Sequence, residues 1–276
     1  DGPFTRRHVH FAHVFKDQLN WQDTLVQFRK GGGALYDLEY LTEESGQRIA
    51  AFGYWAGYVG AALAVLGYSA NSHGESLDAL TSWGNKQALL SSVQSSLPEL
   101  ARKPDALVIG ALGRCGSGAV ELLSGCGIEV TKWDQKETAQ GGPFDDLLDH
   151  DILVNCVYIN SALPPFTTLD HLNNSARRLQ LISDVSCDPF GQYNPLPIYN
   201  RCTTMNQPTE RIIPGSKTQP SLEIIAIDHL PSLLPRESSE QFSADLFPAL
   251  LNLRLLETGV WKRAHEVFSY HLKRLP

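Results

Sequence analysis

The stretch from Ala106 to Asp134, ALVIGALGRCGSGAVELLSGCGIEVTKWD, constrains the fold of this chain more than any other part of the sequence. It reads in order as an apolar strand, a glycine-rich turn, an amphipathic helix and a second strand, which is the order of a βαβ unit. The two strands of such a unit are parallel, and parallel sheets are covered by helices on both faces. The stretch therefore predicts an α/β protein with a doubly wound parallel sheet.

The turn GALGRCGSG at 110–118 has the chemistry of a dinucleotide-binding site. Its spaced glycines, Gly113, Gly116 and Gly118, allow a tight turn and let the backbone approach a pyrophosphate at the start of a helix. Asp134 closes the next strand 24 positions after Gly110, where a carboxylate accepts hydrogen bonds from ribose hydroxyls and repels a 2′-phosphate. The pattern predicts a Rossmann-like domain that binds NAD rather than NADP. S-adenosylmethionine, a nucleotide sugar, or a turn that binds nothing remain as alternatives.

The rest of the chain extends this α/β pattern on both sides of the turn. We expect residues 51–235 to form the NAD-binding domain, and residues 1–50 to form part of a second, incomplete α/β lobe to which the helices of 236–276 return. The expected elements are helices at 17–30, 85–101, 238–253 and 260–273, strands at 34–42, 48–53, 151–159, 179–186 and 222–230, a turn at Ser45-Gly46 and a surface connection at 69–84.

Composition narrows the classes of partner. With 276 residues the chain can bury a normal core without a metal or disulfide, and its formal charge of -7 disfavours a nucleic-acid partner. Its five cysteines form no CxxC pair and no cluster with histidine at metal spacing, so we expect no metal site and a cytoplasmic, reducing environment. We also expect a monomer.

The segment Ile49–Tyr68 contains no charged residue, which raises the question of a membrane span. Its glycines alternate with alanines and aromatic residues rather than with leucines, a composition that inserts weakly into lipid but packs closely against other backbone. We therefore expect a buried helix and no membrane partner.

Several strings of the sequence resemble, in content and in order, those of the fungal-type, lysine-forming saccharopine dehydrogenases. Members of that family use NAD to oxidise the secondary amine of saccharopine, then hydrolyse the imine to lysine and 2-oxoglutarate. The resemblance implies an oxidoreductase of lysine biosynthesis that acts on these small molecules. The matching strings are FAHVFKDQ (11–18), LYDLEY (35–40), RIAAFG (48–53), GALGRCGSGA (110–119), KWDQKET (132–138), GGPFD (141–145) and AIDHLPSLLPRE (226–237).

The resemblance implies roles for individual residues. His13 would be the catalytic acid/base, although a histidine taken by itself is more often a surface or core residue. Arg48 would hold a substrate carboxylate, and Lys16 and Glu39 would tune the charge nearby. The implied substrate-binding residues are Gln18, Arg48, Phe52, Ser186, Cys187 and Asp188. The implied cofactor-binding residues are Gly110, Gly113, Arg114, Cys115, Asp134, Thr138, Tyr158, Val185, Ile227, Asp228, His229 and Leu230.

The chain also departs from the family pattern at some positions, and other interpretations remain open. The resemblance suggests a disulfide between Cys115 and Cys156, for which two buried thiols are the alternative. Family members carry a substrate-binding arginine and a catalytic lysine before the FAH string, neither of which has a counterpart here, and Gln47 stands where the family often has a second arginine. One rival interpretation is a non-catalytic NAD-binding module. Another is a relative of alanine dehydrogenase, which the FAH and AIDHLPSLLPRE strings disfavour.

Overall fold

The structure is a computed structural model that describes every residue except 1, 13, 16–20, 160, 218 and 276. The chain divides into two compact units. Unit 1 comprises residues 1–51 and 239–276, and unit 2 is the continuous segment Phe52–Ser238. Each unit has its own hydrophobic core.

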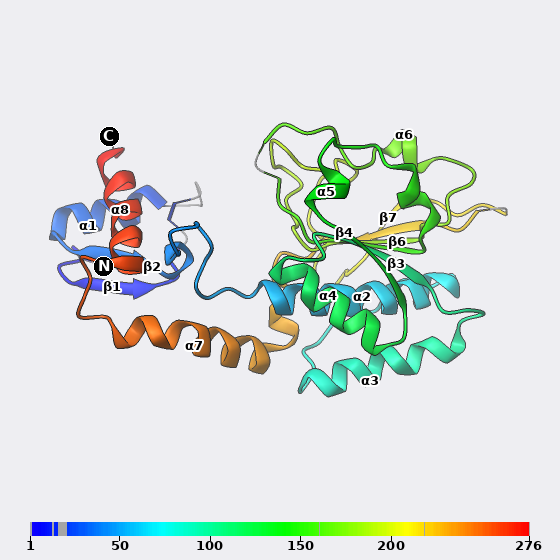
Figure 1. Cartoon of the computed structure of the whole chain (residues 1–276), viewed down its shortest axis with the longest axis horizontal. Coiled ribbons are helices and arrows are strands. Elements are labelled where there is room, and N and C mark those ends of the chain that lie inside the picture. Colours follow the sequence, from blue (N-terminus) through cyan, green and yellow to red (C-terminus); the bar gives the residue numbers. More distant parts are fainter. Residues whose placement is uncertain (1, 13, 16–20, 160, 218, 276) are drawn as a thin grey trace. The chain divides into compact units, whose positions relative to one another are not determined.

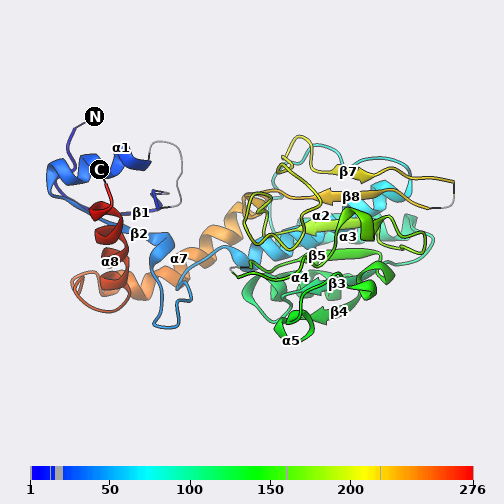
Figure 2. The ribbon, with the colours of Figure 1, turned by 90° about the horizontal axis from the view of Figure 1, so that it is seen from above.

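Unit 2 is built on a six-stranded sheet whose strand order is β4-β3-β5-β6-β8-β7 (Figure 2). The first five strands are parallel, which confirms the predicted fold class. The antiparallel edge strand β7 was not predicted, because its four residues, of which Arg211 is exposed, lack a continuous apolar run. The strands are β3 (Asp105–Ile109), β4 (Glu129–Trp133), β5 (Ile152–Asn155), β6 (Leu181–Asp184), β7 (Glu210–Ile213) and β8 (Leu222–Ile225).

Alternate residues of the strands point into two cores on opposite faces of the sheet. Ala106 and Val108 pack with three long helices, α2 (Gly53–Ser72), α3 (Lys86–Ser96) and α4 (Arg114–Gly125). Leu107 and Ile109 face the other side, which is covered by loops and by the short helices α5 (Gln135–Thr138) and α6 (Leu169–Leu172) (Figure 1). The sheet is thus covered on both faces, although its second layer contains little regular helix.

The uncharged segment of the sequence forms the buried helix α2, as predicted. This helix lies against α4 at a backbone-to-backbone distance that only glycine permits. A Cβ atom on Gly57 would lie 1.9 Å from the carbonyl oxygen of Cys115, and one on Gly118 would lie 2.0 Å from that of Tyr54. Among the described residues, no helix has the length and apolar character needed to cross a bilayer.

Unit 1 contains a two-stranded parallel sheet, β1 (Arg7–His10) with β2 (Ala34–Asp37), next to α1 (Trp21–Gly31) and α8 (Gly259–Lys273). The predicted strand at 48–53 is wrong, because pairing there is limited to one bridge between Thr42 and Arg48. The partner of β2 is instead β1. The strand β2 ends early because the carboxylate of Asp37 accepts a hydrogen bond from the backbone N–H of Glu39 and starts a 3-10 turn. The helix α7 (Pro235–Leu251) crosses the sequence boundary between the units.

Candidate functional site

The sheet of unit 2 places the candidate site at the carboxyl ends of β3 and β5. The chain runs from β3 outward to β4 and then returns past β3 to β5, so the strand order reverses direction between these two strands. Open parallel sheets bind ligands at such a reversal, in the crevice beyond the strand ends. Gly110 follows β3 at this point, and Tyr158 lies shortly beyond the end of β5.

The glycine-rich turn has the close approaches that the sequence predicts. Gly110 has a φ of +80°, a backbone conformation that residues other than glycine rarely adopt. A Cβ atom on Gly116 would lie 2.0 Å from the carbonyl oxygen of Gly110. The helix α4 then begins at Arg114, with the N-cap position occupied by Gly113 and without a side-chain cap. First-turn amides of a helix have no acceptor inside the helix and favour an anion. The turn therefore fits the pyrophosphate of a dinucleotide.

Asp134 lies at the end of β4, beside the turn. Its Oδ2 accepts a hydrogen bond from the backbone N–H of Leu112 at 2.9 Å, and its Oδ1 accepts one from that of Gln135 at 2.8 Å. The hydroxyl of Thr138 donates to the carbonyl oxygen of Asp134 at 3.0 Å. A carboxylate offers about four lone pairs in total, so both oxygens retain capacity for ribose hydroxyls.

Two large apolar side chains stand exposed beside this site. Leu112, in the turn, is 81% exposed, and Tyr158, after β5, is 70% exposed. Tyr158 was among the predicted cofactor-binding residues, whereas Leu112 was not. The sequence contained a signal for Leu112, since a leucine inside a glycine-rich turn has no core to enter. Together the two side chains offer apolar surface to a flat ligand.

A buried carboxylate holds the loop that follows β6. Asp184 is 1% exposed, and its Oδ1 accepts hydrogen bonds from the hydroxyl of Ser186 at 2.6 Å and from the side-chain amide of Asn155 at 2.9 Å. Its Oδ2 accepts one from the hydroxyl of Tyr199 at 2.7 Å. Burial and this negative charge raise the pKa of Tyr199, which stays a donor. Asp184, Asn155 and Tyr199 were not predicted from the sequence, although the polar residues within the apolar strands β5 and β6 are a signal of such a network.

The remaining predicted residues of unit 2 lie at strand ends. Val185 donates its backbone N–H to the carbonyl oxygen of Asn155 at 2.9 Å. Cys187 has a φ of +46°, and Asp188 is partly buried in the turn that follows. Beyond β8, Ile227 and Leu230 are buried whereas Asp228 and His229 are exposed. These predicted residues and the segment Ser186–Asp188 thus lie toward the carboxyl edge of the sheet.

Arg48 is the predicted substrate-binding residue that the structure describes in unit 1. Nη1 of Arg48 lies 3.5 Å from Oε1 of Glu39, which accepts a hydrogen bond from it. Burial, together with the charge of Glu39, raises the pKa of neighbouring Tyr40 to about 12. His13, Gln18 and Lys16 lie outside the described residues. Phe52, the first residue of unit 2, directly precedes α2.

The expected disulfide between Cys115 and Cys156 is not found, because all five cysteines are free thiols. The two side chains are hydrogen-bonded instead, and burial is the main cause that raises the pKa of Cys156. A protonated thiol packed in a core behaves as a small apolar group, which is the alternative that the sequence left open. Among the described residues, no group of histidine, cysteine, aspartate and glutamate is arranged to hold a metal ion.

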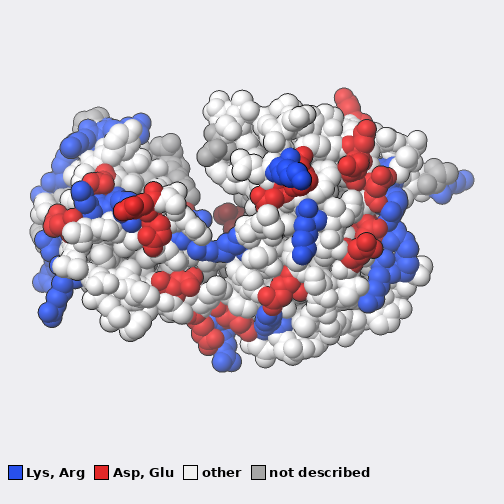
Figure 3. All heavy atoms as spheres, in the orientation of Figure 1, with Lys and Arg blue, Asp and Glu red and all other residues white. Residues whose placement is uncertain are grey.

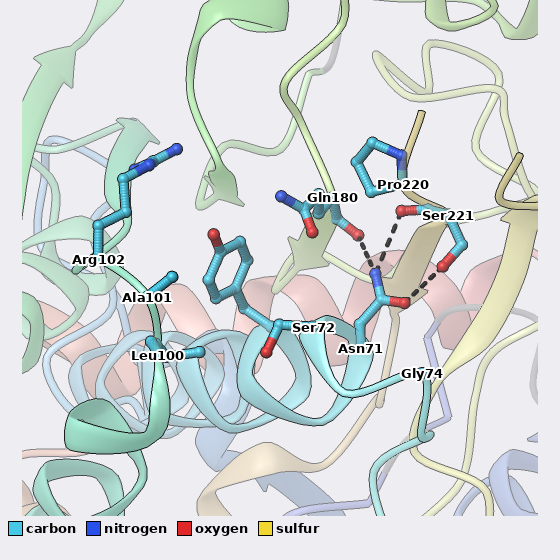
Figure 4. Close-up of a pocket in the computed structure, with 10 residues that line it drawn as sticks. Asn71, Ser72, Gly74, Leu100, Ala101, Arg102, Gln180, Pro220 and Ser221 are labelled. Atoms are coloured by element: carbon cyan, nitrogen blue, oxygen red, sulfur yellow. Dashed lines mark hydrogen bonds between the residues drawn. The ribbon is translucent and has the colours of Figure 1, made fainter. Parts of the chain in front are cut away.

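A pocket of about 480 Å³ lies at the opposite edge of the sheet, near the amino ends of β3, β6 and β8. Its polar groups bond to one another, as Figure 4 shows: the amide of Asn71 donates to the carbonyl oxygens of Gln180 and Ser221. Arg102 at its rim is bound to Asp151 by two hydrogen bonds of 2.7 and 2.6 Å. These groups stabilise the fold, and the carboxyl edge remains the candidate site.

Charge is mixed on the surface. On the face drawn in Figure 3, the described lysines and arginines are interspersed with aspartates and glutamates and form no continuous basic stripe.

A comparison with solved structures supports the fold. An L-alanine dehydrogenase superposes with a TM-score of 0.58 over 95% of this chain and 69% of its own, with 14% sequence identity. At that identity the likeness concerns architecture alone. No family model matches the chain.

Curated relatives are far more similar in sequence. The NAD-dependent, L-lysine-forming saccharopine dehydrogenase of Candida albicans is 44% identical over 294 aligned positions, covering 99% of this chain and 76% of the relative. That of Emericella nidulans is 44% identical over 289 positions, covering 100% of this chain and 77% of the relative. The chain spans about three quarters of their length and aligns almost throughout. It therefore belongs to the family of NAD-dependent, L-lysine-forming saccharopine dehydrogenases.

Proposed function

We propose that this chain is an oxidoreductase that uses NAD to convert saccharopine to L-lysine and 2-oxoglutarate, reversibly, in lysine biosynthesis. The observation that carries the proposal is a glycine-rich turn with Asp134 beside it, in a chain 44% identical to enzymes named for this reaction. NAD supplies the hydride acceptor when bound, and the protein supplies position and proton transfer.

Backbone and side-chain groups of unit 2 would bind and orient the cofactor. The amides at the start of α4 would hold the pyrophosphate, and Asp134 would accept hydrogen bonds from the adenosine ribose. The further cofactor positions we propose are Arg114, Cys115, Thr138, Tyr158, Val185 and Ile227 to Leu230. Gly116 would keep this turn tight, because a Cβ atom there would clash with the backbone of Gly110 and Ala111.

The remaining predicted residues would handle the substrate. Hydride leaves the Cα–H of saccharopine, and water then adds to the resulting imine while His13 moves protons. Arg48 would hold a substrate carboxylate with its planar set of donors, and Gln18, Phe52 and the Ser186–Asp188 segment would line the cavity. We further propose a cytoplasmic monomer; five free thiols suit a reducing compartment, and light scattering measures the mass.

The first experiment measures binding and turnover on the same 276-residue chain. NADH fluorescence gives the dissociation constant, and NADH oxidation in the presence of lysine and 2-oxoglutarate gives the rate. We expect turnover in the wild-type chain, and His13→Ala should lower kcat at least a hundredfold while leaving NADH affinity within twofold. NADH binding without turnover would reject the enzymatic proposal for this chain, and absence of both would reject the cofactor site as well.

Asp134→Asn tests the cofactor side separately. The amide keeps the size of the side chain but removes the negative charge of the oxygens that would accept hydrogen bonds from the ribose hydroxyls. We therefore expect NADH affinity to fall roughly tenfold to a hundredfold. Asp149→Asn, an exposed aspartate in the same domain, is the matched control and should leave affinity unchanged. Equal affinity of Asp134→Asn and the wild type would contradict the assignment.

A further inference from the structure

Two thiols to which the proposed reaction assigns no chemical step are in contact, one of them within the proposed substrate segment. Sγ of Cys187 and Sγ of Cys202 are 3.2 Å apart, within unit 2. A disulfide bond measures about 2.05 Å, so the two atoms need to approach by only about 1.1 Å to bond. The pair joins the loop after β6 to the segment that precedes β7, two parts of the chain separated by 15 positions.

We propose that Cys187 and Cys202 are a redox modification site that hydroperoxides oxidise to a reversible disulfide. The thiolate of Cys202 attacks one oxygen of hydrogen peroxide, the O–O bond breaks, and Cys202 becomes a sulfenic acid as the departing hydroxide takes up a proton to form water. The sulfur of Cys187 then attacks the sulfenic sulfur and loses its proton. The S–S bond forms and a second water leaves, so two thiols and one peroxide give one disulfide and two waters.

Exposure assigns the order of the two steps. Of the five cysteines, all of which the structure describes, Cys202 is the exposed one, so it meets the oxidant first. Cys187 is partly buried, and burial, contact with Cys202 and the charge of Asp184 raise its pKa. Cys187 therefore remains a protonated thiol in contact with Cys202. Cys126 is buried, and Cys115 and Cys156 are only partly accessible, which favours the Cys187–Cys202 pair.

The consequence for catalysis rests on the proposed function. Cys187 lies between Ser186 and Asp188, which we propose line the substrate cavity, and its φ of +46° is uncommon for a residue other than glycine. Ser186 is fixed to Asp184, so movement of the Cys187 sulfur is taken up by this short segment. We expect the disulfide to raise the KM for saccharopine severalfold and to leave NADH affinity within twofold.

The test exposes the whole chain to graded hydrogen peroxide, blocks remaining thiols, and maps peptides by mass spectrometry. We expect one linked peptide pair joining Cys187 to Cys202, which dithiothreitol releases. Cys202→Ser should give no such link, and its KM for saccharopine should not change with peroxide. The proposal is overturned by the absence of this link, by a link between Cys115 and Cys156 in its place, or by equal peroxide sensitivity of KM in Cys202→Ser.

The mass measurement separates this proposal from the enzymatic one. The link between Cys187 and Cys202 forms or fails to form whether or not the chain turns over saccharopine. If turnover is absent, hydrogen exchange of the Ser186–Asp188 backbone measures the effect of the disulfide on this segment. Unchanged exchange on oxidation would overturn the proposed coupling between the disulfide and the segment. Missing turnover by itself would count against the proposed function and not against the redox site.

Discussion

At the scale of single residues, Asp151 shows how one buried charge supports the sheet. Its carboxylate is fully buried, accepts two hydrogen bonds from Arg102, and accepts a third from the backbone N–H of Asp105 at 3.0 Å. Burial by itself would raise the pKa of Asp151, but the hydrogen bonds and the charge of Arg102 outweigh it and hold the pKa below its usual value. The carboxylate is therefore more stable in the folded chain than in the unfolded one.

This linkage predicts an acid-sensitive contribution to stability. Because the folded pKa is lowered, the contribution is present above the unfolded pKa, near 4, and is lost as pH falls through the folded value. Asp151→Asn should lower the free energy of unfolding at neutral pH by about 1.5–3 kcal/mol, since the half-exposed Arg102 can return to water. Urea unfolding between pH 3 and 7 measures both effects. The exposed Asp78→Asn is the control, and equal stability of both variants would contradict the argument.

At the scale of elements, we expect alanine substitutions at two glycines of α4 to change the free energy of unfolding in opposite directions. A Cβ on Gly118 would lie 2.0 Å from the carbonyl oxygen of Tyr54, so Gly118→Ala must separate α4 from α2 and should cost about 1–3 kcal/mol. Gly125 ends the same helix, and a Cβ there meets only a Leu90 methyl group at 3.8 Å. Gly125→Ala should stabilise the chain by about 0.5–1 kcal/mol. Thermal unfolding compares the two, and a shift of the same sign in both would disprove the packing argument.

At the scale of the whole molecule, unit 2 is continuous in sequence and contains two cores of its own. We therefore expect the fragment 52–238 to fold cooperatively and to bind NADH with an affinity within about tenfold of the intact chain, a free-energy difference of about 1.4 kcal/mol. It should not turn over saccharopine, because His13 and Arg48 belong to the other part of the sequence. Circular dichroism and NADH fluorescence measure the two properties. A fragment that folds without binding NADH would contradict the placement of the cofactor site in unit 2.

The sequence by itself determined the parallel sheet, the tight glycine-rich turn and the buried character of α2. Each depends on local chemistry, since the apolar run of β3, the glycines after it and Asp134 lie within 30 residues of one another. The resemblance added the family, which 44% identity then showed. Local pattern was also enough for the long helices, whose apolar faces repeat over several turns.

Tertiary structure decided what depends on partners distant in sequence. The edge strand β7 forms by pairing with β8, and the strand that pairs with β2 is β1 rather than residues 48–53. The network around Asp184 joins Asn155, Ser186 and Tyr199 from three segments, and the thiols of Cys187 and Cys202 meet across a loop. The sequence pattern within one segment does not predict such contacts. The free energy of each contact depends on where the folded chain places the second residue.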